Sequence, residues 1–347
     1  MLLFLLLFSP PPTTARGVSG TVAEGSVIRS IYGHPDRFLE VQERQGGGEK
    51  YFMHIMLYTD REPREEHRRT YIENFLLMIK YSSPNIYYYV TVMGPLTERY
   101  VNQIILTLGI TPQTLPNFFF DHVAVKQMGD ICRHVEVMNS VLASGRRYNT
   151  YFFCNDGTKP VGINSDGAWI NDFEALFTEK TVLAGPLISC QSQVPHVQTH
   201  FFAVKEKGLE ILRATDCPAQ SSKDDIYNRE VLLSWRVMEM GLNIASLQPE
   251  YRNQIFTISP IADRNNIREY SRTGAAPAPC AGYCNPSICI SGNPATIHFI
   301  KWGGTLEDIA VLPRCTFVEG GNSICQSSLA IGETGKEGAF CDHIFQL

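Results

Sequence analysis

Strand and helix patterns alternate regularly along the chain from Tyr51 onward, and no other feature constrains the fold as strongly. The apolar runs Tyr51 to Thr59 and Ile86 to Met93 are too short for buried helices and predict strands covered on both faces. A charged segment with helical spacing of its apolar residues, 61–80, lies between them. The three segments therefore predict one βαβ unit.

The same alternation continues downstream. Helices are predicted at Leu96 to Leu108, Ile131 to Leu142, Trp169 to Phe177, Glu206 to Arg213 and Asp225 to Met240, and strands at Phe118 to Val125, Thr150 to Cys154, Thr181 to Ile188 and His200 to Val204. This order predicts an α/β fold with a mostly parallel, doubly wound sheet flanked by helices. Such sheets bind ligands beyond the carboxyl ends of their strands, where Asp60, Gly94, Asn155 and Asp156 are expected.

Composition excludes two broad classes of protein. The 347 residues are 44% hydrophobic, which is enough for a buried core and excludes a chain that is disordered throughout. The formal net charge is -5, and no run of Lys or Arg is long enough to bind nucleic acid by neutralising phosphates. A nucleic-acid partner is therefore not expected.

The chain before Tyr51 has a different composition. Leu2 to Phe8 form an apolar run that Ser9 and three prolines end, well short of the roughly 20 residues of a membrane helix. Residues 1–15 are predicted to be a signal peptide or the remnant of a signal-anchor, with an artefactual start of the gene as the alternative. Residues 16–49 are polar and glycine-rich and predict a stem or linker, and residues 50–270 are predicted to form the folded domain that follows it.

Cysteines are concentrated near the C-terminus. Of the ten in the chain, six follow residue 279, namely Cys280, Cys284, Cys289, Cys315, Cys325 and Cys341. This density predicts disulfides in an oxidising lumen, and residues 271–347 are expected to pack as a cysteine-rich region on the domain of residues 50–270. The alternative is a zinc site formed by the first three of these cysteines with His298, although the paired C-x2-C spacing typical of zinc sites is absent.

Two stretches carry a resemblance to a known family. Tyr151 to Gly162 reads YFFCNDGTKPVG, and Leu183 to Leu212 contains ISC followed by PHVQTH. They resemble a family of glycosyltransferase-like proteins of algae, fungi and large viruses, which is related to bacterial rhamnan-synthesis proteins. The similarity extends over roughly residues 51–303 and implies a GT-A-like, Rossmann-like fold. The sequence departs from the family at Gly129 to His134, in the block before the central strand, and at Asn155 to Gly157.

The resemblance implies a nucleotide-diphosphate sugar as donor and places Asn155 and Asp156 where GT-A enzymes often carry an Asp-x-Asp motif. A leaving diphosphate needs charge stabilisation, which Mn²⁺ or Mg²⁺ on Asp156 would supply. These ions commonly use only one or two protein carboxylates. Whether the chain needs a metal stays open at this stage, and a plain turn is the alternative for Asn155 to Gly157.

A second candidate site lies in the PHVQTH stretch. His196, Gln198 and His200 alternate, so that on an extended chain their side chains would share one face, with Val197 and Thr199 on the other. Histidine can take a proton from an acceptor hydroxyl, and glutamine can bind sugar hydroxyls. The alternative is a polar edge strand or a buried histidine that is satisfied within the core.

The remaining candidates are single residues. Glu230 is predicted as the general base, with Asp225 as a second carboxylate and a solvated helix face as the alternative. Trp169 is predicted to stack on a sugar ring because its surrounding loop is polar, with a core position as the alternative. Lys301 and His298 are weaker candidates for binding phosphate.

These observations predict a glycosyltransferase of the endoplasmic reticulum or Golgi lumen, or a secreted one, that acts on a glycan or glycoprotein. Any contact with a membrane is expected only through an N-terminal anchor. One alternative is a catalytically silent carbohydrate-binding relative, which would bind glycan and no nucleotide. A secreted, disulfide-rich structural protein is the other, although such scaffolds are usually small and poor in βαβ units.

Overall fold

A computed structural model describes residues 50–58, 85–94, 117–123, 129–160, 167–189, 194–217, 223–248, 251, 253–258, 264, 298–301, 314–317 and 323–326. Among these residues, a seven-stranded sheet has the order β10-β6-β9-β4-β1-β2-β3. In chain order its strands are β1 (Tyr51–Tyr58), β2 (Ile86–Met93), β3 (Phe118–Val123), β4 (Thr150–Asn155), β6 (Thr181–Gly185), β9 (Phe201–Val204) and β10 (Asn243–Ser246).

The sheet is mostly parallel, as predicted, and only β9 runs against its neighbours β4 and β6. The alternation of elements did not predict this reversal. Its physical cause lies in the short connection from β6 to β9, which contains the hairpin β7 (Ile188–Ser189) and β8 (His196–Val197) instead of a crossover helix. A strand that returns beside its predecessor without a crossover pairs antiparallel.

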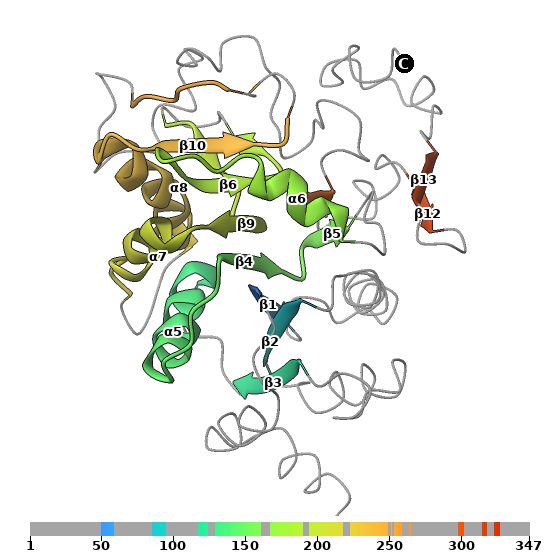
Figure 1. The fold of residues 1–347 in the computed structure, drawn as a ribbon. Helices are drawn as coiled ribbons and strands as arrows, with labels where there is room; N and C mark the ends of the chain where they lie inside the picture. Colours follow the sequence, from blue (N-terminus) through green and yellow to red (C-terminus); the bar gives the residue numbers. More distant parts are fainter. Residues whose placement is uncertain are drawn as a thin grey trace, which may run out of the picture.

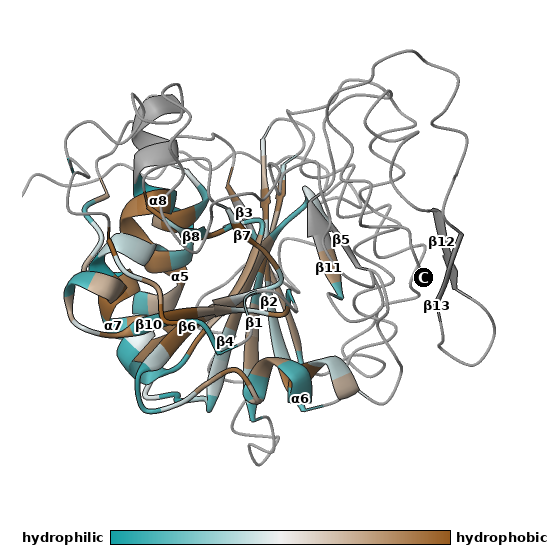
Figure 2. Cartoon of the chain, turned by 90° about the horizontal axis from the view of Figure 1, so that it is seen from above, coloured by the Kyte–Doolittle hydropathy of each residue, from teal (hydrophilic) through white to brown (hydrophobic). Residues whose placement is uncertain are grey.

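Helices cover both faces of the sheet. The longer helices α5 (Asp130–Ala143), α7 (Glu206–Arg213) and α8 (Lys223–Glu239) lie on one face, and α6 (Ala168–Glu174) lies on the other (Figures 1 and 2). On the α6 side, β5 (Thr158–Pro160) pairs with β11 (Phe299–Lys301). We refer to the two sides as the α5 face and the α6 face.

The two faces follow from the alternation of side chains along each strand. In β4, Tyr151 and Phe153 belong to the core cluster of the α5 face, whereas Phe152 and Cys154 belong to that of the α6 face. All four are at most 2% exposed, which explains why the strand sequences are continuous apolar runs.

The cysteines form a pattern that the sequence did not predict. Cys132 in α5 and Cys217, which precedes α8, form a disulfide across 85 residues. Of the predicted C-terminal cysteines, Cys315 and Cys325 lie opposite each other in the hairpin β12 (Arg314–Phe317) and β13 (Ser323–Gln326). Their side chains, the other C-terminal cysteines and residues 1–49 lie outside the described residues. No described helix is long and apolar enough to cross a membrane.

Candidate active site at the carboxyl ends of β1 and β4

The connections of the sheet define one switch point. From β1 the chain proceeds outward to β2 and β3 and then returns to β4, on the other side of β1. In a parallel sheet of this kind the crevice between the carboxyl ends of two such strands is the usual position of a ligand site. Tyr58 at the end of β1 and Asn155 and Asp156 at the end of β4 occupy this place.

Asp156 is buried and oriented by the neighbouring strand. Asp156 is 4% exposed, and its Oδ2 accepts a hydrogen bond from the backbone amide of Tyr58 at 2.9 Å. A buried carboxylate loses much of its hydration and is tolerated only with polar partners. Asp60, which was also expected here, lies outside the described residues.

Asn155 makes two side-chain hydrogen bonds within the protein. Its Oδ1 accepts a hydrogen bond from the Gly157 amide at 2.9 Å, which closes a turn, and its Nδ2 donates to the carboxylate of Asp130. Both polar atoms of the side-chain amide thus have a partner inside the protein, and the predicted contact of Asn155 with donor or acceptor stays a prediction. The turn composition noted in the sequence is real, and it orients Asp156.

Asp130 is a site residue that the sequence reasoning missed. It is the first residue of α5 and is 5% exposed, and its two carboxylate oxygens accept hydrogen bonds from the Tyr58 hydroxyl and the Asn155 side-chain amide. The spacing of Asp130 along the helix could have indicated its role. It lies on the same buried stripe of α5 as His134, Met138 and Val141, and an acidic residue on a buried stripe needs polar partners. In the sequence, Gly129 to His134 are distinguished only by their departure from the family pattern.

The PHVQTH stretch lies directly beside this cluster. The backbone oxygen of His200 accepts hydrogen bonds from the Asn155 backbone amide, at 3.1 Å, and from the Thr158 hydroxyl. The structure therefore brings together the two segments that the sequence singled out. The predicted polar and apolar faces are wrong, because β8 ends at Val197, the chain turns at Thr199 and His200, and all five residues from His196 to His200 are buried.

His196 is held in one tautomer. Its Nδ1 lies 3.1 Å from the Val194 carbonyl oxygen, which can only accept, so Nδ1 carries the proton and in the neutral ring Nε2 carries the lone pair. The next residue, Val197, donates its backbone amide to Ser234 Oγ of α8 at 3.0 Å. Glu230, the predicted base, lies one turn before Ser234 on α8 and is half-buried. Asp225 is also in α8, but its side chain lies outside the described residues.

Gln198 has a buried side chain, 7% exposed, and its Oε1 accepts no hydrogen bond from any described residue. Its backbone amide donates to Leu187 O at 3.1 Å, which fixes it next to the β7-β8 hairpin. A buried amide oxygen without a partner is costly, so this atom is a candidate for accepting a hydrogen bond from a ligand or water. The predicted role of Gln198 in binding sugar hydroxyls stays a prediction.

Trp169 does not have the predicted role. Its residue is 1% exposed, and its ring packs edge-to-face against Phe152, Phe201 and Phe299, with centroids 5.1, 6.1 and 5.2 Å away. Aromatic side chains occupy the space that a sugar would need. The polar loop before α6 suggested exposure, but apolar contacts with the sheet determine where the ring lies.

The two phosphate candidates lie on the α6 side of the site. Lys301 in β11 is opposite Thr158 in β5, two residues after Asp156, although its side chain lies outside the described residues. His298 is 5% exposed, and its Nε2 lies 2.7 Å from Asp172 Oδ2. Within the described part of the chain, no three His, Cys, Asp or Glu side chains form a metal cluster. Binding of a metal by Asp156 therefore stays a prediction.

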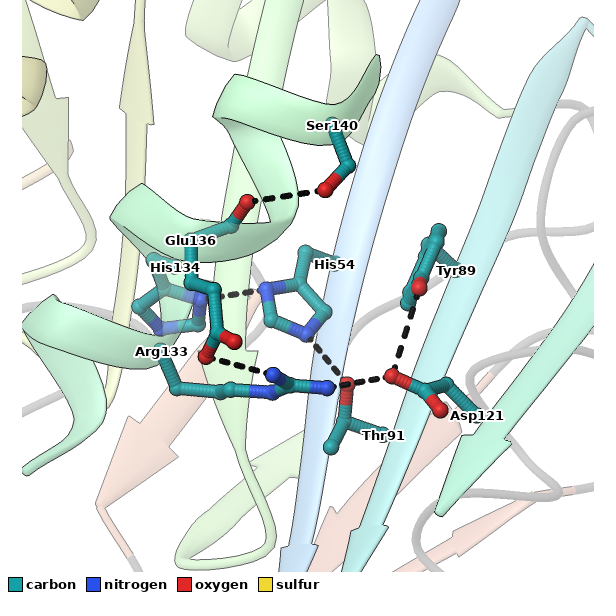
Figure 3. A network of polar contacts seen from close by, with 8 residues as sticks. All are labelled: His54, Tyr89, Thr91, Asp121, Arg133, His134, Glu136 and Ser140. Atoms are coloured by element: carbon teal, nitrogen blue, oxygen red, sulfur yellow. Dashed lines mark hydrogen bonds and ion pairs between the residues drawn. The ribbon is translucent and has the colours of Figure 1, made fainter. Parts of the chain in front are cut away.

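A second polar cluster lies between α5 and the middle of strands β1 and β2, next to the site. His134 Nδ1 is 2.8 Å from His54 Nδ1, and His54 Nε2 is 3.0 Å from Thr91 Oγ1. Figure 3 shows these residues beside the ion pairs of Arg133 with Asp121 and with Glu136. The polar side of α5 therefore continues from the site for at least one helical turn into the protein.

Burial determines the charge of this histidine pair. The pKa of His134 is lowered to about 3, mainly by loss of hydration; Asp130 opposes the shift, and Arg133 contributes to it. Burial, His134 and Arg133 together hold the pKa of His54 well below its ordinary value. Both rings are neutral near pH 7, and one Nδ1 donates to the other.

Comparison with known proteins gives structural likeness only. No protein-family model matches the sequence, and no curated protein matches it. Similar solved structures include a nucleoside-diphosphate-sugar pyrophosphorylase from Vibrio cholerae (11% identity, 56% of this chain and 89% of that one, TM-score 0.31). Others are a glycosyltransferase involved in glycosylation of the major capsid of PBCV-1 (11%, 64% and 98%, 0.31) and mouse xyloside xylosyltransferase 1 (7%, 54% and 71%, 0.29).

At these identities and TM-scores the likeness carries no information about substrate or reaction. The relationship to rhamnan-synthesis proteins and to the proteins of algae, fungi and large viruses stays a prediction.

Proposed function

We propose that this chain is a glycosyltransferase that moves a sugar from a nucleotide-diphosphate donor to a glycan or glycoprotein acceptor. The observation that carries the proposal is the buried carboxylate of Asp156, held by the Tyr58 amide where the carboxyl ends of β1 and β4 diverge. A nucleotide fits such a switch point, and a carboxylate there suits a diphosphate whose charge a cation must offset.

The reaction breaks the bond between sugar C1 and the diphosphate oxygen, and the acceptor oxygen forms the new bond to C1. The acceptor hydroxyl loses its proton, for which His196 Nε2 and Glu230 are the two candidate bases. A Mn²⁺ or Mg²⁺ ion, if bound, would be held by Asp156 and would offset the charge of the departing diphosphate. Donor contacts by Gln198, His200 and Lys301 belong to the same proposal.

The disulfide supports the predicted compartment. A bond between Cys132 and Cys217 persists in the oxidising lumen of the endoplasmic reticulum or Golgi, or outside the cell, and is rare in a reduced cytosol. We therefore retain the secretory pathway as the proposed location, with residues 1–15 as the proposed signal or anchor.

Thermal unfolding of the full chain with UDP, GDP, dTDP or CMP, with and without Mn²⁺, tests the proposal. A nucleotide present at 100 times its Kd stabilises the folded state by about 2.7 kcal/mol, which raises the Tm by several degrees. The matching nucleotide sugars then identify the donor through release of the nucleotide. A cooperative transition that no nucleotide shifts would overturn the proposal, and a shift with glycan alone would favour the silent carbohydrate-binding relative.

Substitution links that response to the site. Asp156→Asn keeps the shape of the side chain and removes its charge, so sugar transfer should fall on the order of 100-fold or more. Glu179→Gln is the matched control because it makes the same chemical change at an exposed position just before β6. Equal activity of the two variants would exclude Asp156 from the reaction.

A further inference from the structure

The polar contacts around Tyr58 form a closed ring. The Tyr58 hydroxyl donates to Asp130, the Asn155 side-chain amide donates to the other oxygen of Asp130, and Asn155 continues through the peptide bond to Asp156. The carboxylate of Asp156 then accepts from the Tyr58 backbone amide at 2.9 Å, which returns to the starting residue. Three chain segments, the ends of β1 and β4 and the start of α5, are joined by this ring.

We propose that Asp130 is the positioning residue of the donor site: from the first turn of α5 its carboxylate accepts hydrogen bonds from Tyr58 and Asn155, and it thereby fixes Asp156. This inference rests on the proposed function and adds a residue and a cause to it. Asp130 acts through Asn155 and Tyr58 and is not assigned a contact with the donor.

The identity of residue 155 follows from this arrangement. An aspartate there would bring a second carboxylate within hydrogen-bonding distance of Asp130, at a place where both residues are more than nine-tenths buried. Two like charges so close and so poorly hydrated cannot both be ionised. An asparagine has the same shape and donates a proton instead, and its Oδ1 still accepts from Gly157. The asparagine at position 155 is therefore complementary to Asp130.

The place of Asp130 on α5 also favours its charge. Its helix has 14 residues, and a negative side chain in the first turn is stabilised by the amide groups of the helix N-terminus. The disulfide at Cys132 ties this same turn to the segment before α8. The carboxylate is thus held both by its hydrogen bonds and by the anchoring of the helix that carries it.

An exchange of the two residues tests the inference. Asp130→Asn loses an acceptor, because one of its two donors then faces an NH2 group, and Asn155→Asp places two carboxylates in contact. In the double variant the new amide at position 130 accepts from the Tyr58 hydroxyl and donates to the new carboxylate at position 155, which restores the ring with reversed polarity. The measurement is the nucleotide concentration that gives half of the full Tm shift, in the presence of Mn²⁺, for wild type, both single variants and the double variant.

We expect each single variant to need about 10-fold more nucleotide, as partners of ligand-binding side chains usually do when changed, and the double variant to return toward the wild-type value. Glu179→Gln should match wild type. A double variant as impaired as the two losses combined, or single variants with wild-type affinity, would overturn the inference alone. A wild-type protein without any nucleotide response would overturn the proposed function, and the role of Asp130 with it. The Tm of each protein without nucleotide shows whether it is folded.

Discussion

The two faces of the sheet share the same strands but are built from different side chains. On the α6 face, β4 presents Phe152 and Cys154 to a packed group of aromatic rings, in which Phe201 and Phe299 stack with centroids 3.7 Å apart. On the α5 face, the same strand presents Asn155 to Asp130, and its neighbour β1 presents His54 to His134. The centre of the α6 face is filled by apolar rings, and its polar contacts, Thr150 with Glu174 and His298 with Asp172, involve α6. The α5 face has buried polar and charged groups between its strands and its helix.

This difference shows where the protein departs from what stability alone requires. Burial of an apolar group stabilises the folded state. A buried carboxylate or imidazole destabilises it unless hydrogen bonds replace the lost hydration. The α6 face is explained by folding. The polar groups of the α5 face lie on a line from the middle of the sheet to the switch point, which is the pattern expected where a site, and not only a core, is supported.

The largest effect on stability is expected from Trp169→Ala on the α6 face. Removing this ring leaves a cavity between Phe152, Phe201 and Phe299, and the free energy of unfolding should fall by about 3–5 kcal/mol. Urea unfolding measures the loss, and nucleotide affinity of the molecules that remain folded should not change. A variant of unchanged stability with weakened sugar binding would contradict the core position and restore the sequence prediction.

Sequence predicted the elements that local signals determine. The predicted bounds of β2 and α7 agree with the structure, and that of β1 differs by one residue, because apolar runs and helical periodicity are read within one segment. The strand predicted at Thr181 to Ile188 is divided into β6 and β7, with Pro186 between them. A proline removes a backbone donor, which explains the division.

Contacts between distant segments were not predictable in the same way. The sequence identified Asn155 and Asp156 but missed Asp130, since their proximity depends on how α5 packs on the sheet. Nor does any local pattern pair Cys132 with Cys217, which are 85 residues apart. Trp169 was misplaced for a related reason, because the polarity of its loop is local information, whereas its burial is not.

A smaller effect, confined to the α5 face, is expected from pH. The folded-state pKa of His134 is about 3, against an ordinary value of about 6.5, so between these values the unfolded chain binds more protons. The stability from this group is therefore fully present above about pH 6.5 and is lost as the pH falls toward 3, by about 1.4 kcal/mol per pH unit. His54, whose pKa is also lowered, acts in the same direction.

Urea unfolding at pH 7 and pH 5 measures this loss, which should reach about 2 kcal/mol for His134, and His54 adds to it in the same direction. The charged residues around the pair are Asp130 and Arg133 on α5 and Asp121 on β3, which pairs with Arg133. The His134→Gln variant leaves all three unchanged, so its comparison with wild type isolates the histidine. The variant should lose the part of the pH dependence that comes from His134. An unchanged dependence would mean that the histidine pair is not buried as a neutral unit.

The smallest effect comes from two adjacent residues of β2 that face opposite sides. Thr91 Oγ1 is the partner of His54 Nε2 on the α5 face, and Val92 belongs to the apolar cluster of the α6 face. Thr91→Val, which is nearly isosteric, should reduce the free energy of unfolding by about 1 kcal/mol because His54 loses its partner. Val92→Thr makes the reverse chemical change and should cost about 1–3 kcal/mol, because its hydroxyl enters an apolar environment.

Both losses are measured by urea unfolding at pH 7, and the pair forms its own control, since the same two side chains are exchanged at neighbouring positions. Loss of a hydroxyl at position 91 and gain of a hydroxyl at position 92 should both destabilise the fold only if the α5 face is polar there and the α6 face is apolar. If Thr91→Val were stabilising, the hydroxyl would be dispensable and the polar network would end at His54. If Val92→Thr were neutral, the α6 face would accept polar groups, and the contrast between the two faces would no longer locate the site.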